Sequence, residues 1–123
     1  MPVILVIDDN DDERQIYSAV LHYNGFDVEE ATNALSGIDL AKALKPAAIV
    51  MDVRLPGLNG LLATEILRAT PETSRIPVVC VSGYDVPPAQ ATEAGCERML
   101  RKPVPPTDLV LAVRAVIEPQ VSS

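Results

Sequence analysis

The sequence predicts an α/β protein in which a doubly wound parallel sheet carries helices on both faces. Three short runs rich in Val and Ile show no alternation of apolar and polar residues, which is typical of strands buried on both faces. Helical patterns separate these runs, so strand and helix alternate five times along the chain. Such alternation favours right-handed crossovers between parallel strands.

The expected strands follow from the apolar runs and from the turn residues between them. Two further runs mix apolar and charged residues, and this pattern suits the edges of a sheet. In chain order, the five predicted strands are Val3–Ile7, Asp27–Glu30, Ala47–Met51, Ile76–Val81 and Arg98–Arg101.

Capping and stop signals delimit the expected helices. Asn10 and Glu13 have the spacing of a capping pair at the start of the first helix. Asn24-Gly25, Pro46 and Gly95 end the first, second and fourth helices. We expect one domain over residues 1–119, with residues 120–123 as a terminal tail or the start of a linker. The predicted helices are Asp11–Tyr23, Ala34–Leu44, Leu61–Ala69, Ala89–Ala94 and Thr107–Ile117.

Length, composition and charge narrow the function classes. A chain of 123 residues with 48% apolar and 22% charged residues fits one folded domain. The net charge of −7 disfavours nucleic acid and anionic membranes as partners and favours a cation or a basic protein. The sequence contains no apolar run approaching the ~20 residues of a membrane span and no signal-peptide pattern, so we expect a cytoplasmic protein.

The cysteines and the single histidine suggest no chemistry of their own. Cys80 lies in an apolar run and Cys96 in a turn, and their spacing resembles neither a metal knuckle nor a redox pair, so we expect buried or loop thiols. His22 lies on a predicted helix without a Ser, Cys or second His spaced to work with it. We therefore expect a structural role for His22.

Acidic residues mark the carboxyl ends of two predicted strands. Asp8 and Asp9 end the first strand, and Asp52 ends the third. If these strands are neighbours, the three carboxylates converge where ligands of open parallel sheets bind. Their mutual repulsion favours a neutralising cation, and oxygen ligands at a site open to water favour Mg²⁺.

Other charged and polar residues near these strand ends have different expected roles. Asp11, Asp12 and Glu13 are interpreted as a solvated first helical turn, where negative charge suits the helix dipole. Ser82 follows the fourth strand and Lys102 the fifth, so both fall on the same rim as the acids. A hydroxyl and an ammonium there would bind phosphoryl oxygens.

The motifs ILVIDD, VMDVRLPGLNG, VVCVSG, AGCERML and the Lys-Pro dipeptide resemble the receiver domain of two-component response regulators, from about Val3 to Ile117. The resemblance implies a five-stranded, flavodoxin-like sheet of order 2-1-3-4-5. It also implies that Asp52 accepts a phosphoryl group. Mg²⁺ would be bound by Asp52, directly by Asp9, by the backbone carbonyl of Arg54, and by Asp8 through a water.

The resemblance assigns modulating roles as well. Ser82 corresponds to the phosphoryl-sensing hydroxyl and Lys102 to the family's lysine, and the Lys102-Pro103 bond is expected to be cis. Met99 occupies the position at which many members carry an aromatic residue that becomes buried on phosphorylation. Because methionine packs more flexibly than an aromatic ring, we expect a weaker conformational response here.

Two large side chains near the expected phosphorylation site lead us to expect a long-lived phosphorylated state. Arg54 and Tyr84 stand two residues beyond Asp52 and Ser82, respectively. In the family these positions flank the path of the hydrolysing water, so bulk there should obstruct attack on the acyl phosphate.

The function implied by the resemblance is a signalling switch that catalyses only its own phosphorylation and dephosphorylation. The donor would be a histidine kinase or a histidine phosphotransfer protein. The output would be a protein contact on the fourth helix, fifth strand and fifth helix, with no nucleic-acid or membrane partner. Alternatives are a phosphorylation-independent adaptor and a fragment of a hybrid kinase or larger regulator. A small Mg²⁺ hydrolase with an aspartyl nucleophile fits poorly, because such enzymes usually carry a second Asp where this chain has Arg54.

Overall fold

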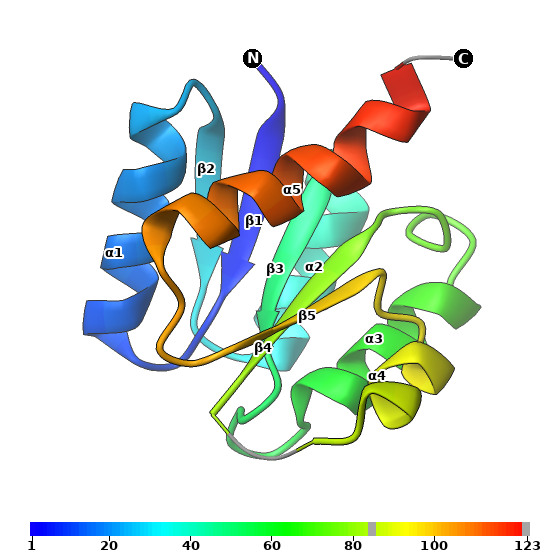
Figure 1. Ribbon diagram of the computed structural model, residues 1–123. Coiled ribbons are helices and arrows are strands. Elements are labelled where there is room, and N and C mark those ends of the chain that lie inside the picture. The colour runs from blue at the N-terminus through cyan, green and yellow to red at the C-terminus, as the bar shows by residue number, and fades with distance from the viewer. Residues whose placement is uncertain (84–85, 122–123) are drawn as a thin grey trace.

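The computed structural model describes residues 1–83 and 86–121, over which strands and helices alternate as predicted (Figure 1). The strands of this part of the chain are β1 (Val3–Ile7), β2 (Asp27–Ala31), β3 (Ala48–Asp52), β4 (Val78–Ser82) and β5 (Arg98–Arg101). Its helices are α1 (Asp11–Tyr23), α2 (Ala34–Leu44), α3 (Gly60–Ala69), α4 (Pro88–Ala94) and α5 (Pro106–Val121).

The strands form a parallel sheet in the order β2-β1-β3-β4-β5, so the predicted fold class and strand order are confirmed. The chain runs outward from β1 to β2 and then crosses back to β3 on the other side of β1. This reversal between β1 and β3 is the position at which doubly wound folds bind ligands.

Two apolar clusters fill the spaces on either side of the sheet, which explains why the central strands show no alternation. Figure 1 shows α1 and α5 over one face and α2, α3 and α4 over the other. Leu5 and Ile7 of β1 pack in the cluster under α2, α3 and α4. Ile4 and Val6 of the same strand pack in the cluster under α1 and α5. All four side chains are fully buried.

Several element ends differ from the sequence predictions. β4 begins at Val78 rather than Ile76, because Pro77 has no N–H to donate to a strand ladder. α5 continues to Val121, beyond the predicted end at Ile117. The predicted boundary between a domain at 1–119 and a tail at 120–123 stays a prediction.

The expectation of separate thiols is wrong, because Cys80 and Cys96 form a disulfide. Cys80 lies in the centre of β4, and Cys96 lies in the turn between α4 and β5. The packing of α4 against the sheet brings the two Cα atoms to 6.3 Å, within the usual range for a disulfide.

Across residues 1–83 and 86–121, no helix combines the length and the apolar character required to cross a membrane.

Candidate functional site

The register of the sheet places Asp8 beside Asp52 at the carboxyl ends of two neighbouring strands. Ile7 of β1 pairs with Met51 of β3, so the residues that follow lie side by side. Both aspartates are almost inaccessible to solvent, at 1% exposed for Asp8 and 3% for Asp52. Two like charges are therefore held together in a poorly hydrated position.

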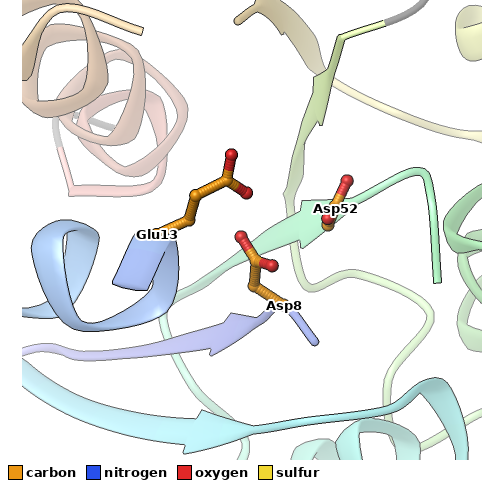
Figure 2. Close-up of side chains that lie close together, drawn as sticks. All are labelled: Asp8, Glu13 and Asp52. Carbon is orange, nitrogen blue, oxygen red and sulfur yellow. The ribbon is translucent and has the colours of Figure 1, made fainter. Parts of the chain in front are cut away.

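A third carboxylate completes the acidic cluster, and it is that of Glu13 from the first turn of α1. One oxygen from each of Asp8, Glu13 and Asp52 lies within 4.8 Å of the others. Figure 2 shows the three side chains converging from β1, α1 and β3. Asp9 is exposed and does not belong to this cluster, although it lines the same surface hollow. The hollow is also lined by Asn10, Glu13, Asp52, Arg54, Leu55, Pro56 and Lys102.

Local hydrogen bonds at the start of α1 orient the cluster. Asn10 is the N-cap, and its side-chain oxygen accepts a hydrogen bond from the backbone N–H of Glu13 at 2.9 Å. The backbone N–H of Asn10 donates to Asp8 Oδ1 at 2.8 Å. The predicted capping pair thus exists in one direction only, because Asp8 takes the N–H that a capping glutamate would bind.

Lys102 supplies the positive charge at this rim. Its Nζ lies 2.8 Å from Glu13 Oε2 and 3.4 Å from Asp52 Oδ2. Its backbone N–H donates to the carbonyl oxygen of Ser82 at 3.0 Å, which connects the ends of β4 and β5. The bond to Pro103 is cis, as predicted.

Burial governs the protonation of the two aspartates. It raises the pKa of Asp8 to about 7, against the hydrogen bond from Asn10, and the charges of Asp52 and Glu13 raise it further. Burial also raises the pKa of Asp52, opposed by the N–H of Arg54 at 3.1 Å and by Lys102. For Lys102, burial lowers the pKa, but Glu13, Asp52 and Asp8 outweigh this and raise it overall.

The carboxylates fit a hard divalent cation. Asp8 Oδ2 is buried without a hydrogen-bond partner in the part of the chain that the structure describes. Such an oxygen is costly unless a cation or a proton satisfies it. All three members of the cluster offer carboxylate oxygens beside a hollow open to water, which is the setting that Mg²⁺ prefers.

The other predicted site residues lie near the cluster, except where the chain is not described. Ser82 is buried at the end of β4, directly after Val81, which pairs with Asp52. Arg54 is exposed at the edge of the hollow. Met99 is half-buried on β5. Tyr84 lies outside the described residues, so its predicted shielding role stays a prediction, as does that of Arg54.

Two residues of the site were not recognised from the sequence. The sequence pattern predicts a solvated helix start for Glu13, whereas in the structure its carboxylate lies with those of Asp8 and Asp52. Arg14 is buried, and its guanidinium donates to the carbonyl oxygen of Asp8 and to the carboxylates of Asp11 and Glu30. Arg14 thereby joins α1 to β2 behind the acidic cluster.

Comparison with known proteins identifies the family of this fold and site. The family model of the response regulator receiver domain matches residues 4–114. Protein PilH of Pseudomonas aeruginosa is 36% identical over 119 residues, which cover 95% of this chain and 98% of PilH. The polar-differentiation response regulator DivK of Brucella anthropi is 27% identical over 103 residues, covering 82% of this chain and 84% of DivK.

A solved structure agrees in fold. The receiver domain of the sensor histidine kinase PA1611 from Pseudomonas aeruginosa superposes with a TM-score of 0.87 at 26% identity, covering 95% of this chain and 98% of that domain. That structure has a magnesium ion coordinated in its active site cleft. The chain belongs to the response regulator receiver domain family, whose members act in two-component signalling and bind Mg²⁺ in an acidic site.

Proposed function

We propose that this protein is a phosphorylation-dependent signalling switch that accepts a phosphoryl group on Asp52. The observation that carries the proposal is the position of Asp52, which is buried at the end of β3 beside Asp8 and within 3.4 Å of the Lys102 ammonium. An acceptor carboxylate with acidic side chains for a metal ion on one side and an ammonium on the other has the neighbours that phosphoryl transfer requires.

The reaction forms and then breaks an acyl phosphate. An Asp52 oxygen attacks phosphorus, and the bond from phosphorus to the donor breaks, either P–N in a phosphohistidine or P–O in a small acyl phosphate. The electron pair of that bond leaves with the donor. Later, water attacks the phosphorus and returns Asp52 as a carboxylate together with inorganic phosphate. We infer that Lys102 binds a phosphoryl oxygen throughout. Its ammonium lies 3.4 Å from Asp52 Oδ2 and has three N–H donors, which supports this role.

A Mg²⁺ ion bound by the acidic cluster would neutralise the negative charge of the phosphoryl oxygens. We propose that Asp8, Asp9 and Asp52 bind it together with the backbone carbonyl of Arg54. The orphaned Oδ2 of Asp8 supports a role for Asp8. Asp9 is exposed and lines the same hollow as Asp52, which supports a role for Asp9.

Ser82 and Met99 belong to the proposed readout. The buried hydroxyl of Ser82 would turn toward the phosphoryl group, and Met99 on β5 would repack in response. The donor would be a histidine kinase or histidine phosphotransfer protein, and the output a protein contact on the face formed by α4, β5 and α5. A cytoplasmic location stays a prediction.

Two other functions make different predictions for the same experiment. A phosphorylation-independent adaptor would use the fold only as a docking surface and would acquire no phosphate. A hydrolase would consume the phosphodonor rapidly without a lasting adduct. The combination of Asp8, Asp9, Asp52, Ser82 and Lys102 supports the switch, because an adaptor does not need these side chains at the ends of its strands.

The test is phosphorylation by acetyl phosphate with Mg²⁺, followed by intact-protein mass spectrometry. Wild type should gain one phosphate, and Asp52→Asn should gain none while keeping its fold, because the change is nearly isosteric and removes a like charge from the cluster. Asp39→Asn, an exposed acid on α2, is the matched control and should label as wild type does. Labelling that survived in Asp52→Asn would contradict the assignment.

A further inference from the structure

Glu13 directs its carboxylate into the site because the capping arrangement of α1 leaves that carboxylate free. A glutamate at the third position of a helix commonly binds the backbone N–H of the N-cap residue. Here that N–H belongs to Asn10 and donates to Asp8 Oδ1 at 2.8 Å. The N–H of Glu13 is itself fixed by the Asn10 side chain at 2.9 Å. The Glu13 side chain is thus anchored at its base and reaches across the rim of the sheet.

Lys102 is shared between two carboxylates, and the shorter contact is to Glu13. The Nζ to Oε2 distance is 2.8 Å, whereas the Nζ to Asp52 Oδ2 distance is 3.4 Å. The Glu13 side chain is 33% exposed and that of Lys102 is 21% exposed, so bulk water only partly screens this ion pair. The pair links the first turn of α1 to the residue after β5.

We propose that Glu13 is a positioning residue for Lys102, and that it competes with the phosphoryl group for the ammonium once Asp52 is phosphorylated. The inference rests on the proposed function of Asp52. In the resting protein, Glu13 holds Lys102 at the rim. A phosphoryl group on Asp52 brings more negative charge to the same ammonium and is repelled by the Glu13 carboxylate. Glu13 therefore opposes the phosphorylated state.

The same charge acts in the opposite direction on a divalent cation. One oxygen of the Glu13 carboxylate lies within 4.8 Å of an oxygen of Asp8 and an oxygen of Asp52, so the charge of Glu13 attracts Mg²⁺ to the site. Glu13→Gln keeps the size and an oxygen acceptor but removes the charge. The substitution should therefore weaken Mg²⁺ binding and, at saturating Mg²⁺, speed phosphorylation. If Glu13 only supported the local structure, its substitution would lower both the Mg²⁺ affinity and the rate of phosphorylation.

The experiment compares wild type, Glu13→Gln, Glu13→Ala and Asp12→Asn. Asp12 lies in the same helical turn and is exposed, so its substitution removes the same charge without removing a contact to Lys102. Three quantities are measured: Mg²⁺ affinity by calorimetry, the rate of labelling by acetyl phosphate at saturating Mg²⁺, and the NMR signals of the Lys102 side chain in ¹³C-lysine protein without Mg²⁺ or donor.

For both Glu13 variants, we expect Mg²⁺ affinity to fall about two- to fivefold and labelling to accelerate by a similar factor, as for a partly exposed ion pair. The Lys102 signals should shift in both Glu13 variants and stay at their wild-type positions in Asp12→Asn. Labelling that slowed together with Mg²⁺ binding, or Lys102 signals unmoved by Glu13→Gln, would overturn the proposal.

A failure of this inference is distinguishable from a failure of the proposed function. If wild type labels at Asp52 and Glu13→Gln labels at the same rate, the positioning role is wrong and the switch stands. If wild type does not label, or Asp52→Asn does, the proposed function is wrong. The competition for Lys102 is then overturned with it.

Discussion

Single residues of the site carry an electrostatic cost, and Asp8 illustrates it best. Its carboxylate is buried, and one of its oxygens has no partner among the described residues. Burial, with the neighbouring carboxylates, raises its pKa from 3.8 to about 7. Between these two values the folded protein holds a proton that the unfolded chain has lost. The free energy of unfolding of the metal-free protein should therefore fall as the pH rises through this window.

Asp8→Asn should remove most of this pH dependence from the metal-free protein. At about pH 8 the variant should be more stable than wild type by about 1–3 kcal/mol, since one pKa unit corresponds to about 1.4 kcal/mol and water entering the site relieves part of the shift. Only well below the unfolded pKa of 3.8, at about pH 3 and lower, should the difference shrink toward zero, because Asp8 is then mostly protonated in the folded and the unfolded protein alike. The measurement is urea unfolding in EDTA across this range.

Asp12→Asn serves as the control for this experiment, because it removes an exposed acid close in sequence to Asp8. Its stability should follow the wild-type pH curve. A smaller slope should remain in Asp8→Asn, because burial raises the pKa of Asp52 as well. If the free energy of unfolding depended on pH in the same way in wild type and in Asp8→Asn, the burial of Asp8 would not be the cause of the pH dependence.

At the scale of elements, the join between β3 and α3 fixes the backbone beneath Asp52. Gly60 begins α3, and its N–H donates to the carbonyl oxygen of Val53 at 2.8 Å. A Cβ on Gly60 would lie 2.8 Å from Val53 Cα and would overlap the carbonyl oxygen of Asp52. The helix can approach the strand end this closely only with glycine at this position.

Gly60→Ala should therefore destabilise the protein by about 1–3 kcal/mol, as overpacking does, although Ala favours helices more than Gly. It should also slow labelling of Asp52, because the backbone that carries the acceptor must shift. Gly83→Ala is the control for stability, since its Cβ would meet Lys102 atoms only at 3.6 Å and beyond. Thermal unfolding and labelling rates test both statements, and a Gly60→Ala variant that matched wild type in both would contradict them.

The elements show what the sequence could and could not predict. The central strands were recognisable because burial on both faces removes alternation, and Asn-Gly, Pro and Gly residues marked the helix ends. The acids at the ends of β1 and β3 were recognisable because parallel strands end at one edge. The direction of Glu13 was not, because helical periodicity alone does not show that Asp8 would bind the N–H of the N-cap residue Asn10.

A contact between distant parts of the chain was also not predictable from the sequence. The pairing of Cys80 with Cys96 depends on how closely α4 packs on the sheet, and residue spacing does not give that distance. The disulfide therefore arises from the packing of the whole molecule rather than from a local pattern.

At the scale of the whole molecule, the sheet itself connects Asp52 to the proposed output face. Ser82 follows Val81, the partner of Asp52, and pairs with Arg101 of β5. The carbonyl oxygen of Ser82 accepts the N–H of Lys102 at 3.0 Å. Met99 packs against the same apolar cluster as residues of α4. We therefore expect a movement of the end of β4 to displace β5 and its neighbours.

Phosphorylation should consequently change the amide NMR signals of residues 98–101 as well as those of the loop after Asp52. In Ser82→Ala, Asp52 should still be labelled, because the hydroxyl is not the acceptor, but the changes on β5 should shrink to less than about half. The reason is that β4 would lose the group that turns toward the phosphoryl oxygens, and a hydrogen bond to a charged group is worth about 1.5–3 kcal/mol. The measurement compares amide spectra with and without acetyl phosphate at saturating Mg²⁺. Changes confined to the Asp52 loop in wild type would show that the sheet does not transmit the signal to this face.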